Sequence, residues 1–232
     1  MAVQENEDMQ AQLLAAALPH VAFDGWSETS LRAACQDLSI TRPMAALACP
    51  RGAIDLAIRF HHDGDEAMQV VLQKTDINAM KIREKITFSV RARLDAIRDK
   101  EAVRRGATLM ALPQHAAEGA GLVWGTCDRI WAAIGDSSAD VNWYTKRLTL
   151  SSVYSATVLY WLGDNSPNHQ DTWTFLDRRI ENVMQFEKFK AQVNANPLAK
   201  QLLAGPNWLL SKIKAPSGVP TVDLPGNWSR RS

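Results

Sequence analysis

The sequence predicts an all-α fold, and three observations support this. Apolar residues recur at spacings of three and four along most of the chain, which is the period of an amphipathic helix. The alternation of apolar and polar residues that marks a half-buried strand is missing over any useful length. Gly, Pro and Asp–Gly signals divide the chain into segments of helical length. With 232 residues, 46% of them hydrophobic, the chain can form one bundle, or a large and a small one sharing a core.

Short helices are predicted near the N-terminus. The first stops near Asp24, where a glycine follows. Ser27 can cap the second, because its side-chain oxygen accepts hydrogen bonds from the free N–H groups of a first turn. The third opens at Thr41, with Pro43 tolerated in its first turn. A fourth begins near Pro50.

Longer helices follow, separated by glycines and prolines. They are expected at 79–99, 103–112, 116–134, 139–162 and 168–190. The chain is therefore divided into an N-terminal helical triplet (8–50), a helical bundle (51–190), an amphipathic C-terminal helix or helices (191–214) and a tail expected to be disordered (215–232), because that tail is rich in Pro and Gly.

Charge and cysteine content narrow the class of protein. A net charge of +1 gives no overall attraction to nucleic acid. Cys35, Cys49 and Cys127 are far apart and are interpreted as reduced thiols that pack inside the protein. Glu5 and Glu7 stand where a basic targeting segment would be, and no apolar run approaches the roughly 20 residues of a spanning helix. We expect a soluble or peripheral protein.

Two polar-aromatic runs carry the most specific signal. The first extends from Gly135 to Arg147 and contains the adjacent pair Trp143–Tyr144 at the start of a helix. The second extends from Asp164 to Arg179. Their order closely resembles the C-terminal half of the TetR-like lipid-binding accessory proteins of coenzyme Q (ubiquinone) biosynthesis, the ninth family of the coenzyme Q series.

The N-terminal residues resemble the helix-turn-helix of TetR proteins, which extends the resemblance to about residues 10–215. The segments that carry it are Leu14–Leu18, Asp24–Trp26, Ser30–Ala34 and Asp37–Ile40. The resemblance implies a TetR-like bundle, no enzymatic activity and no cofactor. Its mitochondrial members carry a presequence, so its absence here suggests a bacterial cytoplasmic protein associated peripherally with the inner membrane.

The resemblance also implies a docking patch for a hydroxylase of ubiquinone biosynthesis. Residue by residue, the patch maps onto Asp140, Asn142, Trp143, Tyr144 and Arg147. Two neighbours depart from the family pattern, since a valine stands at 141 and a lysine at 146. Helical spacing predicts that Trp143 is the exposed anchor and Tyr144 the buried ring. The alternative is that both rings only brace the start of the helix.

The helix predicted at 139–162 is apolar almost all round, which is typical of a central helix. Small residues interrupt it and could leave room for a ligand, as could the Ala- and Gly-rich run 116–121. Plain core packing is the alternative from composition alone, whereas relatives hold an isoprenoid lipid there. The expected lipid contacts are Tyr144, Leu148, Ser151, Ser152, Ser155 and Leu159.

DNA binding is expected to be lost. A recognition helix needs donors for base edges and cations for phosphates. Here Arg42 is the one polar candidate, and Ala46–Ala48 stand where TetR repressors usually place aromatic and basic residues. Between Ser27 and Pro50 two cations are balanced by two anions.

No catalytic motif is present. The chain has no Glu-x-x-His pair for a di-iron site, no nucleophile elbow and no phosphate-binding loop. The one ligand-rich cluster, His61–Glu66, is interpreted as a solvated turn at a helix end, because contiguous residues fan out around a helix and do not converge on a metal. We predict no metal site.

The C-terminal region combines cations with apolar residues, the composition of an interfacial membrane helix. The Gly205–Pro206 pair makes two short helices as plausible as one. Docking on the chain's own bundle or on a dimer partner is the alternative, which leaves a homodimer open. The predicted membrane contacts are Leu198, Leu202, Leu203, Trp208, Leu209 and Ile213.

The function expected from these features is accessory lipid binding in ubiquinone biosynthesis. The protein would bind a polyprenylated quinone precursor, or a phospholipid, and present the precursor to a membrane-associated hydroxylase. A TetR-type repressor that senses an apolar ligand is the alternative. A module that uses Trp143 and Tyr144 for protein contacts without any ligand is the third class.

Overall fold

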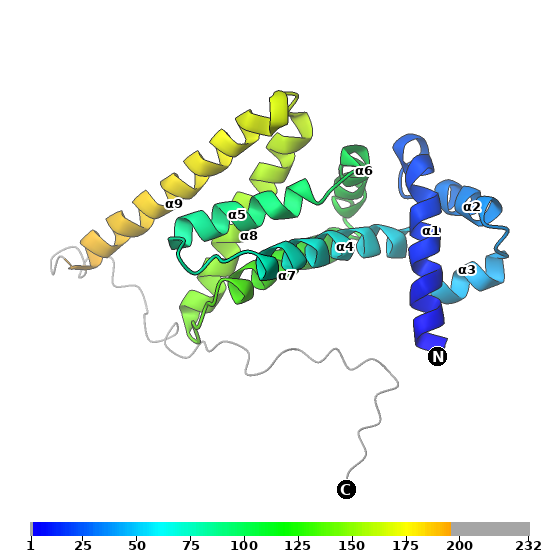
Figure 1. Cartoon of the computed structure of the whole chain (residues 1–232), viewed down its shortest axis with the longest axis horizontal. Helices are drawn as coiled ribbons and strands as arrows, with labels where there is room; N and C mark the ends of the chain where they lie inside the picture. The colour runs from blue at the N-terminus through cyan, green and yellow to red at the C-terminus, as the bar shows by residue number, and fades with distance from the viewer. Residues whose placement is uncertain (1, 196–232) are drawn as a thin grey trace, which may run out of the picture.

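The computed structural model describes the backbone of residues 2–195 and the side chains of residues 5–186. All regular elements in this part of the chain are helical (Figure 1). They are α1 (Ala2–Asp24), α2 (Glu28–Asp37), α3 (Arg42–Ala48), α4 (Ala53–Lys74), α5 (Ile82–Asp95), α6 (Lys100–Met110), α7 (Ala116–Ala133), α8 (Val141–Gly163), the short 3₁₀ helix η1 (Pro167–His169) and α9 (Gln170–Ala195). The predicted all-α fold is confirmed.

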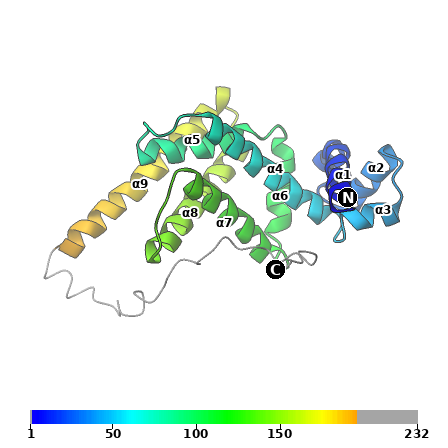
Figure 2. The same ribbon diagram turned by 60° about the horizontal axis from the view of Figure 1, so that its bottom comes forward.

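Helices α1–α3 lie together at one end of the molecule, as both ribbon views show (Figures 1 and 2). Leu13, Ala17 and Ala34 are fully buried between them. The predicted cap is present: the Ser27 hydroxyl accepts from the backbone N–H of Thr29 at 3.2 Å. This cap fixes where α2 begins and therefore how it returns across α1.

Helix α4 joins this triplet to the rest of the bundle. Its first turns bury Ala53 and Leu56 in the N-terminal cluster. Its later turns bury Met68 and Leu72 in the main core. One continuous helix therefore shares its apolar face between two cores, and its rigidity sets the relative position of the two.

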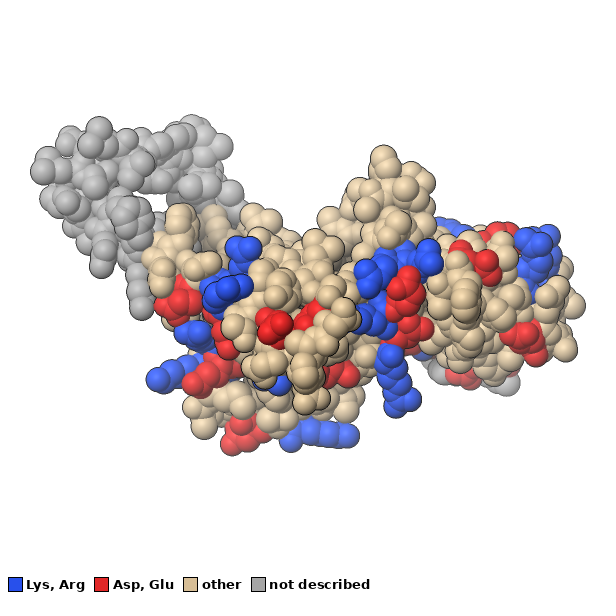
Figure 3. All heavy atoms as spheres, turned by 90° about the horizontal axis from the view of Figure 1, so that it is seen from above, with Lys and Arg blue, Asp and Glu red and all other residues tan. Residues whose placement is uncertain are grey.

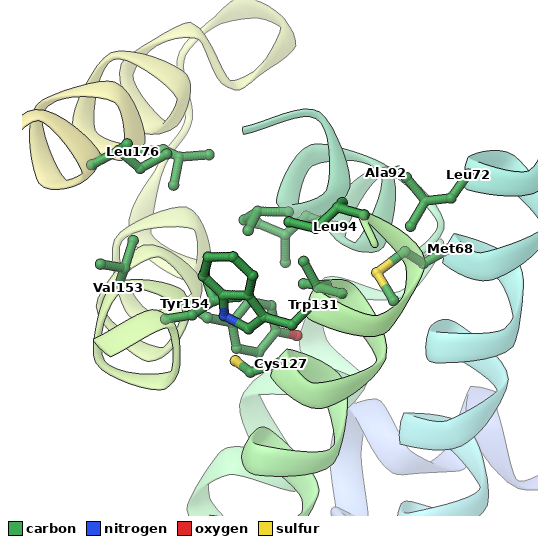
Figure 4. Packing of buried hydrophobic residues seen from close by; sticks show 14 of the residues in the cluster. Met68, Leu72, Ala92, Leu94, Cys127, Trp131, Val153, Tyr154 and Leu176 are labelled. Atoms are coloured by element: carbon green, nitrogen blue, oxygen red, sulfur yellow. The ribbon is translucent and has the colours of Figure 1, made fainter. Parts of the chain in front are cut away.

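The main core lies where α5, α7, α8 and α9 meet. Figure 4 shows Leu94, Cys127, Trp131 and Tyr154 directed toward one another from α5, α7 and α8. The indole of Trp131 donates to the backbone carbonyl of Lys146 at 3.2 Å, so its one polar atom is satisfied. Burial raises the pKa of the Cys127 thiol to about 12, which agrees with the packing role predicted for the cysteines.

The helix expected at 79–99 is shorter than predicted. It begins at Ile82, because Glu84 accepts from the backbone N–H of Lys81 at 2.8 Å and closes the first turn. It ends at Asp95, and Asp99 then caps α6 by accepting from the backbone N–H of Ala102 at 2.9 Å. The local capping residues decided these boundaries.

The interpretation of His61–Glu66 as a solvated turn is wrong. These residues lie inside α4, and the side chain of Asp65 is 1% exposed. Arg93 on α5 supplies the opposite charge at 2.6 Å from Asp65. A buried carboxylate needs such a partner, and the sequence around Asp65 does not contain it.

Helix α9 continues to Ala195, beyond its predicted end at 190. The six residues predicted to contact a membrane, from Leu198 to Ile213, lie outside the described residues. So does the tail 215–232. Within the described part, no helix combines the length and the apolar character needed to cross a bilayer.

Candidate functional site: a cavity bordered by an aromatic cluster

A cavity of about 650 Å³ lies among α4, α5, α6, α7 and α8. Its lining is predominantly apolar, with Phe60, Leu94, Val103 and Val158 among the contributing residues. The volume is in the usual range for ligand pockets. Five of the six residues predicted for lipid contact line it, namely Leu148, Ser151, Ser152, Ser155 and Leu159. Tyr144, the sixth, is not part of the lining.

Small residues create this space. Gly106, Ala107 and Ala120 line the cavity where larger side chains would fill it. Gly119 lets α7 approach α6 closely, because a Cβ at this position would lie 2.8 Å from the Cβ of Met110. These small residues leave a cavity on one side of α8.

The cavity has an open side and a closed side. Leu148 and Leu159 of α8 are 65% and 67% exposed, so they form its mouth. Arg93, Leu94 and Tyr154 are buried and form its floor, on α5 and α8.

Besides the three serines of α8, the polar part of the lining is the floor with the adjacent His61. The guanidinium Nε of Arg93 donates to Asp65, and its Nη2 donates to the backbone carbonyl of His61 at 2.9 Å. The Thr126 hydroxyl donates to Asp65 at 2.9 Å. Burial lowers the pKa of His61 to about 4, despite the nearby Asp65 carboxylate, so the imidazole is neutral at physiological pH.

Beside the mouth lies an aromatic cluster, formed by Trp124, Trp143 and Tyr144. The ring centroid of Trp143 is 5.9 Å from that of Trp124 and 4.8 Å from that of Tyr144. Trp124 also lines the cavity. The cluster and the cavity are therefore parts of one continuous surface, linked by a residue that sequence reasoning missed. A bulky aromatic within the small-residue run 116–125 was the available signal.

Trp143 and Tyr144 are both partly exposed. The prediction that Trp143 is exposed and Tyr144 buried is therefore wrong. Trp124 comes from α7 and contacts both rings, which shields each of them in part. Spacing along α8 alone could not show this neighbour.

Arg147, predicted as a partner contact, has a side chain only 4% exposed. Its guanidinium bonds to Asp128 at 2.5 Å and to Asp136 at 3.0 Å. It also lies 4.0 Å from the centre of the Trp143 ring. The geometry makes Arg147 a support that holds Trp143 in place, because its Nε and Nη1 donate to Asp128, Asp136 and the backbone carbonyl of Trp143 inside the protein.

Asp140 and Asn142, the remaining patch residues, are exposed. Asp140 caps α8 by accepting from the backbone N–H of Asn142 at 3.0 Å. The Asn142 amide donates to the second Asp140 oxygen at 2.9 Å. These two residues fix the start of α8, directly before Trp143 and Tyr144.

In the triplet, Arg42 forms an ion pair with Glu28. The exposed side chains of α3 include Met44 and Leu47, at 44% and 68%. On the face drawn in Figure 3, Lys and Arg are interspersed with Asp and Glu, without a broad area of positive charge. Phosphate contacts require such an area.

Among the described side chains, no group of three or more His, Cys, Asp and Glu residues is arranged to hold a metal ion. Asp65 is committed to Arg93 and Thr126.

Comparison with known proteins places these features in context. Residues 116–187, which include α7, α8 and most of α9, match the family model described as COQ9. The chain is 29% identical to ubiquinone biosynthesis protein COQ9, mitochondrial, of Rattus norvegicus, over 83% of this chain and 64% of the relative. It is 30% identical to the Drosophila melanogaster protein of the same name, over 79% of this chain and 58% of the relative.

The aligned region spans less than two thirds of the length of either of these relatives. Among solved structures, a TetR transcriptional regulator from Nitrosomonas europaea superimposes with a TM-score of 0.60 and 17% identity, covering 75% of this chain and 97% of that one. The chain thus has the helical fold of a TetR regulator, and its sequence is similar to ubiquinone biosynthesis protein COQ9.

Proposed function

We propose that this protein is a non-enzymatic accessory protein of ubiquinone biosynthesis that binds a polyprenylated quinone precursor and delivers it to a membrane-associated hydroxylase. The observation that carries the proposal is the position of Trp124. It lines the cavity and also contacts Trp143, so a ligand site and a candidate docking surface share one side chain. The similarity to COQ9 proteins is the reason for proposing ubiquinone biosynthesis as the pathway.

The lipid part of the proposal follows from the cavity. A polyprenyl tail is insoluble in water, and burying its surface gains about 25 cal/mol per Å². Most of the lining is apolar, which suits such a tail. The exposed Leu148 and Leu159 at the mouth give the tail an apolar path in and out.

The delivery part follows from the aromatic cluster. Half-buried Trp and Tyr rings beside an arginine support are typical of binding hot spots. Their position next to the cavity mouth means that a docked hydroxylase would lie over the exit path. A membrane-binding helix within residues 191–214 remains a proposal from the sequence.

The experiment that tests the proposal is mass spectrometry of organic extracts from the purified protein. We expect a polyisoprenoid lipid in the wild type. Ser155→Phe places a ring inside the cavity and should lower the extracted lipid severalfold. Thr145→Phe, on an exposed face of the same helix, is the matched control and should leave it unchanged. Wild-type protein free of lipid that also fails to take up added isoprenoids would refute the proposal.

A repressor is the second candidate, because the fold match is to a TetR transcriptional regulator. The ion pair of Arg42 with Glu28 and the apolar surface of α3 disfavour it. An operator complex of nanomolar affinity that weakens with salt would favour the repressor over the accessory protein.

A further inference from the structure

We propose that residues 111–125, which form the loop after α6 and the first half of α7, are a lid over the cavity. The lid opens to let the ligand exchange, and a bound ligand holds it closed. This inference rests on the proposed function and adds to it the step that controls entry and release of the ligand.

The first argument is the contrast in burial between the two halves of α7. None of the residues 111–125 is buried. The second half begins with Thr126 and Cys127, which are both 0% exposed, and Figure 4 shows Cys127 directed into the core. The Thr126 hydroxyl also donates to Asp65 at 2.9 Å. Segments with few buried apolar side chains open at a lower free energy than the whole fold, so the lid can open while the second half of α7 stays in place.

The second argument is that the inner face of the lid borders the cavity. Six of its residues line the cavity, namely Ala111, Gly119, Ala120, Leu122, Val123 and Trp124. A ligand in the cavity would contact this face and bury more of its apolar surface. The ligand therefore binds the closed lid better than the open one, and this difference in affinity shifts the lid toward the closed state.

The third argument is the placement of glycines inside the helix. A Cβ at Gly121 or Gly125 would meet no atom of the described chain within 4 Å, and neither residue lines the cavity. Packing explains Gly119, which lies against Met110 at the base of the lid, but it does not explain these two. Glycine is less favourable than alanine inside a helix, so Gly121 and Gly125 lower the stability of this half of α7.

The fourth argument is that solvent reaches the contacts that fasten the lid. Glu118 accepts from Arg51 at 2.9 Å, and their side chains are 34% and 54% exposed. Such exposed ion pairs stabilise little. At the other end of the lid, Trp124 contacts the partly exposed rings of Trp143 and Tyr144 on α8. These contacts can break without disturbing the core, and a protein docked on Trp143 and Tyr144 would touch one of them.

Hydrogen–deuterium exchange of the full-length protein measures lid opening. In protein stripped of lipid, we expect amides of the lid to exchange at least tenfold faster than those of residues 150–162 in α8. Farnesol, a short isoprenoid, serves as the probe ligand. At about ten times its dissociation constant, it should slow exchange in the lid by about tenfold, because it binds only the closed state.

Variants outside the cavity lining test whether opening controls exchange of the ligand. Gly121→Ala and Gly125→Ala should each slow amide exchange in the lid by about fivefold, and should slow release of a fluorescent farnesyl probe in stopped flow to a similar extent. Glu118→Gln removes the ion pair and should accelerate both by about twofold. Gly163→Ala, at the last residue of α8, is the matched control, because its Cβ also meets no atom within 4 Å, and it should change neither rate.

The outcomes separate the lid from the proposed function. Lid amides that exchange as slowly as those of α8 in lipid-free protein, or unchanged probe release in a variant whose lid exchange has slowed, would overturn the lid while leaving lipid binding intact. Farnesol that binds without protecting the lid would likewise show that the ligand does not hold it closed. Rapid lid exchange in a protein that binds neither farnesol nor the probe would confirm the opening and refute the proposed function.

Discussion

Arg147→Ala tests whether Arg147 is a support inside the fold or a contact for the partner. The change removes the bond to Asp136, whose side chain is 2% exposed, the bond to the more exposed Asp128, and the stacking on Trp143 at 4.0 Å. Removing one member of a buried ion pair costs about 3–5 kcal/mol. Asp136 keeps Lys146 at 2.8 Å as a second cation, so we expect the lower end of this range.

Urea unfolding, followed by tryptophan fluorescence, measures this loss. Asp136→Asn and the double variant complete a cycle, in which the two single losses should exceed the loss in the double variant by about 1.5–3 kcal/mol, the value of a hydrogen bond to a charged group. A loss below about 1 kcal/mol in Arg147→Ala, together with abolished hydroxylase binding, would refute the reasoning and return Arg147 to the docking surface.

The Asp136 carboxylate should also make the free energy of unfolding depend on pH in the acid range. Burial alone would raise the pKa of Asp136, but hydrogen bonds from Lys146, Ser138 and Arg147 outweigh it and lower the pKa to about 2. A lowered folded-state pKa stabilises the fold above the unfolded value of about 4, and this stabilisation is lost as pH falls from there toward 2. Wild-type protein should lose more stability over this interval than Asp136→Asn, and equal pH slopes would contradict the prediction.

Three further predictions concern binding. Trp143→Ala should weaken binding to the hydroxylase by about 2 kcal/mol in a titration while the protein stays folded, and unchanged affinity would place the docking site elsewhere. The protein should show no sequence-specific DNA binding in a mobility-shift assay across salt concentrations, and a salt-sensitive nanomolar complex would contradict this. Deleting the residues after Asn194 should reduce co-sedimentation with anionic liposomes, by about 1 kcal/mol for each cation removed near the surface, and equal co-sedimentation would exclude membrane contact there.

The sequence by itself determined the helices and most of their limits. Ser27 caps α2 as predicted, and Gly135 breaks the chain after α7. These are contacts between near neighbours, so sequence reasoning can reach them. The resemblance of the two polar-aromatic runs likewise agrees with the similarity to COQ9 over residues 116–187.

The tertiary structure decided what each side chain does. Asp65 is a buried member of an ion pair because the packing of α4 against α5 brings Arg93 next to it. The two residues are 28 positions apart in the sequence, so local sequence reasoning did not connect them. Arg147 became a support because Asp128 and Asp136 converge on it from α7 and the following loop. Trp124 joined the cavity to the aromatic cluster. Periodicity identifies the apolar face of each helix, but it does not show which helix packs against that face. The packing of the helices decides which side chains are buried and which opposite charge lies beside each buried charged group.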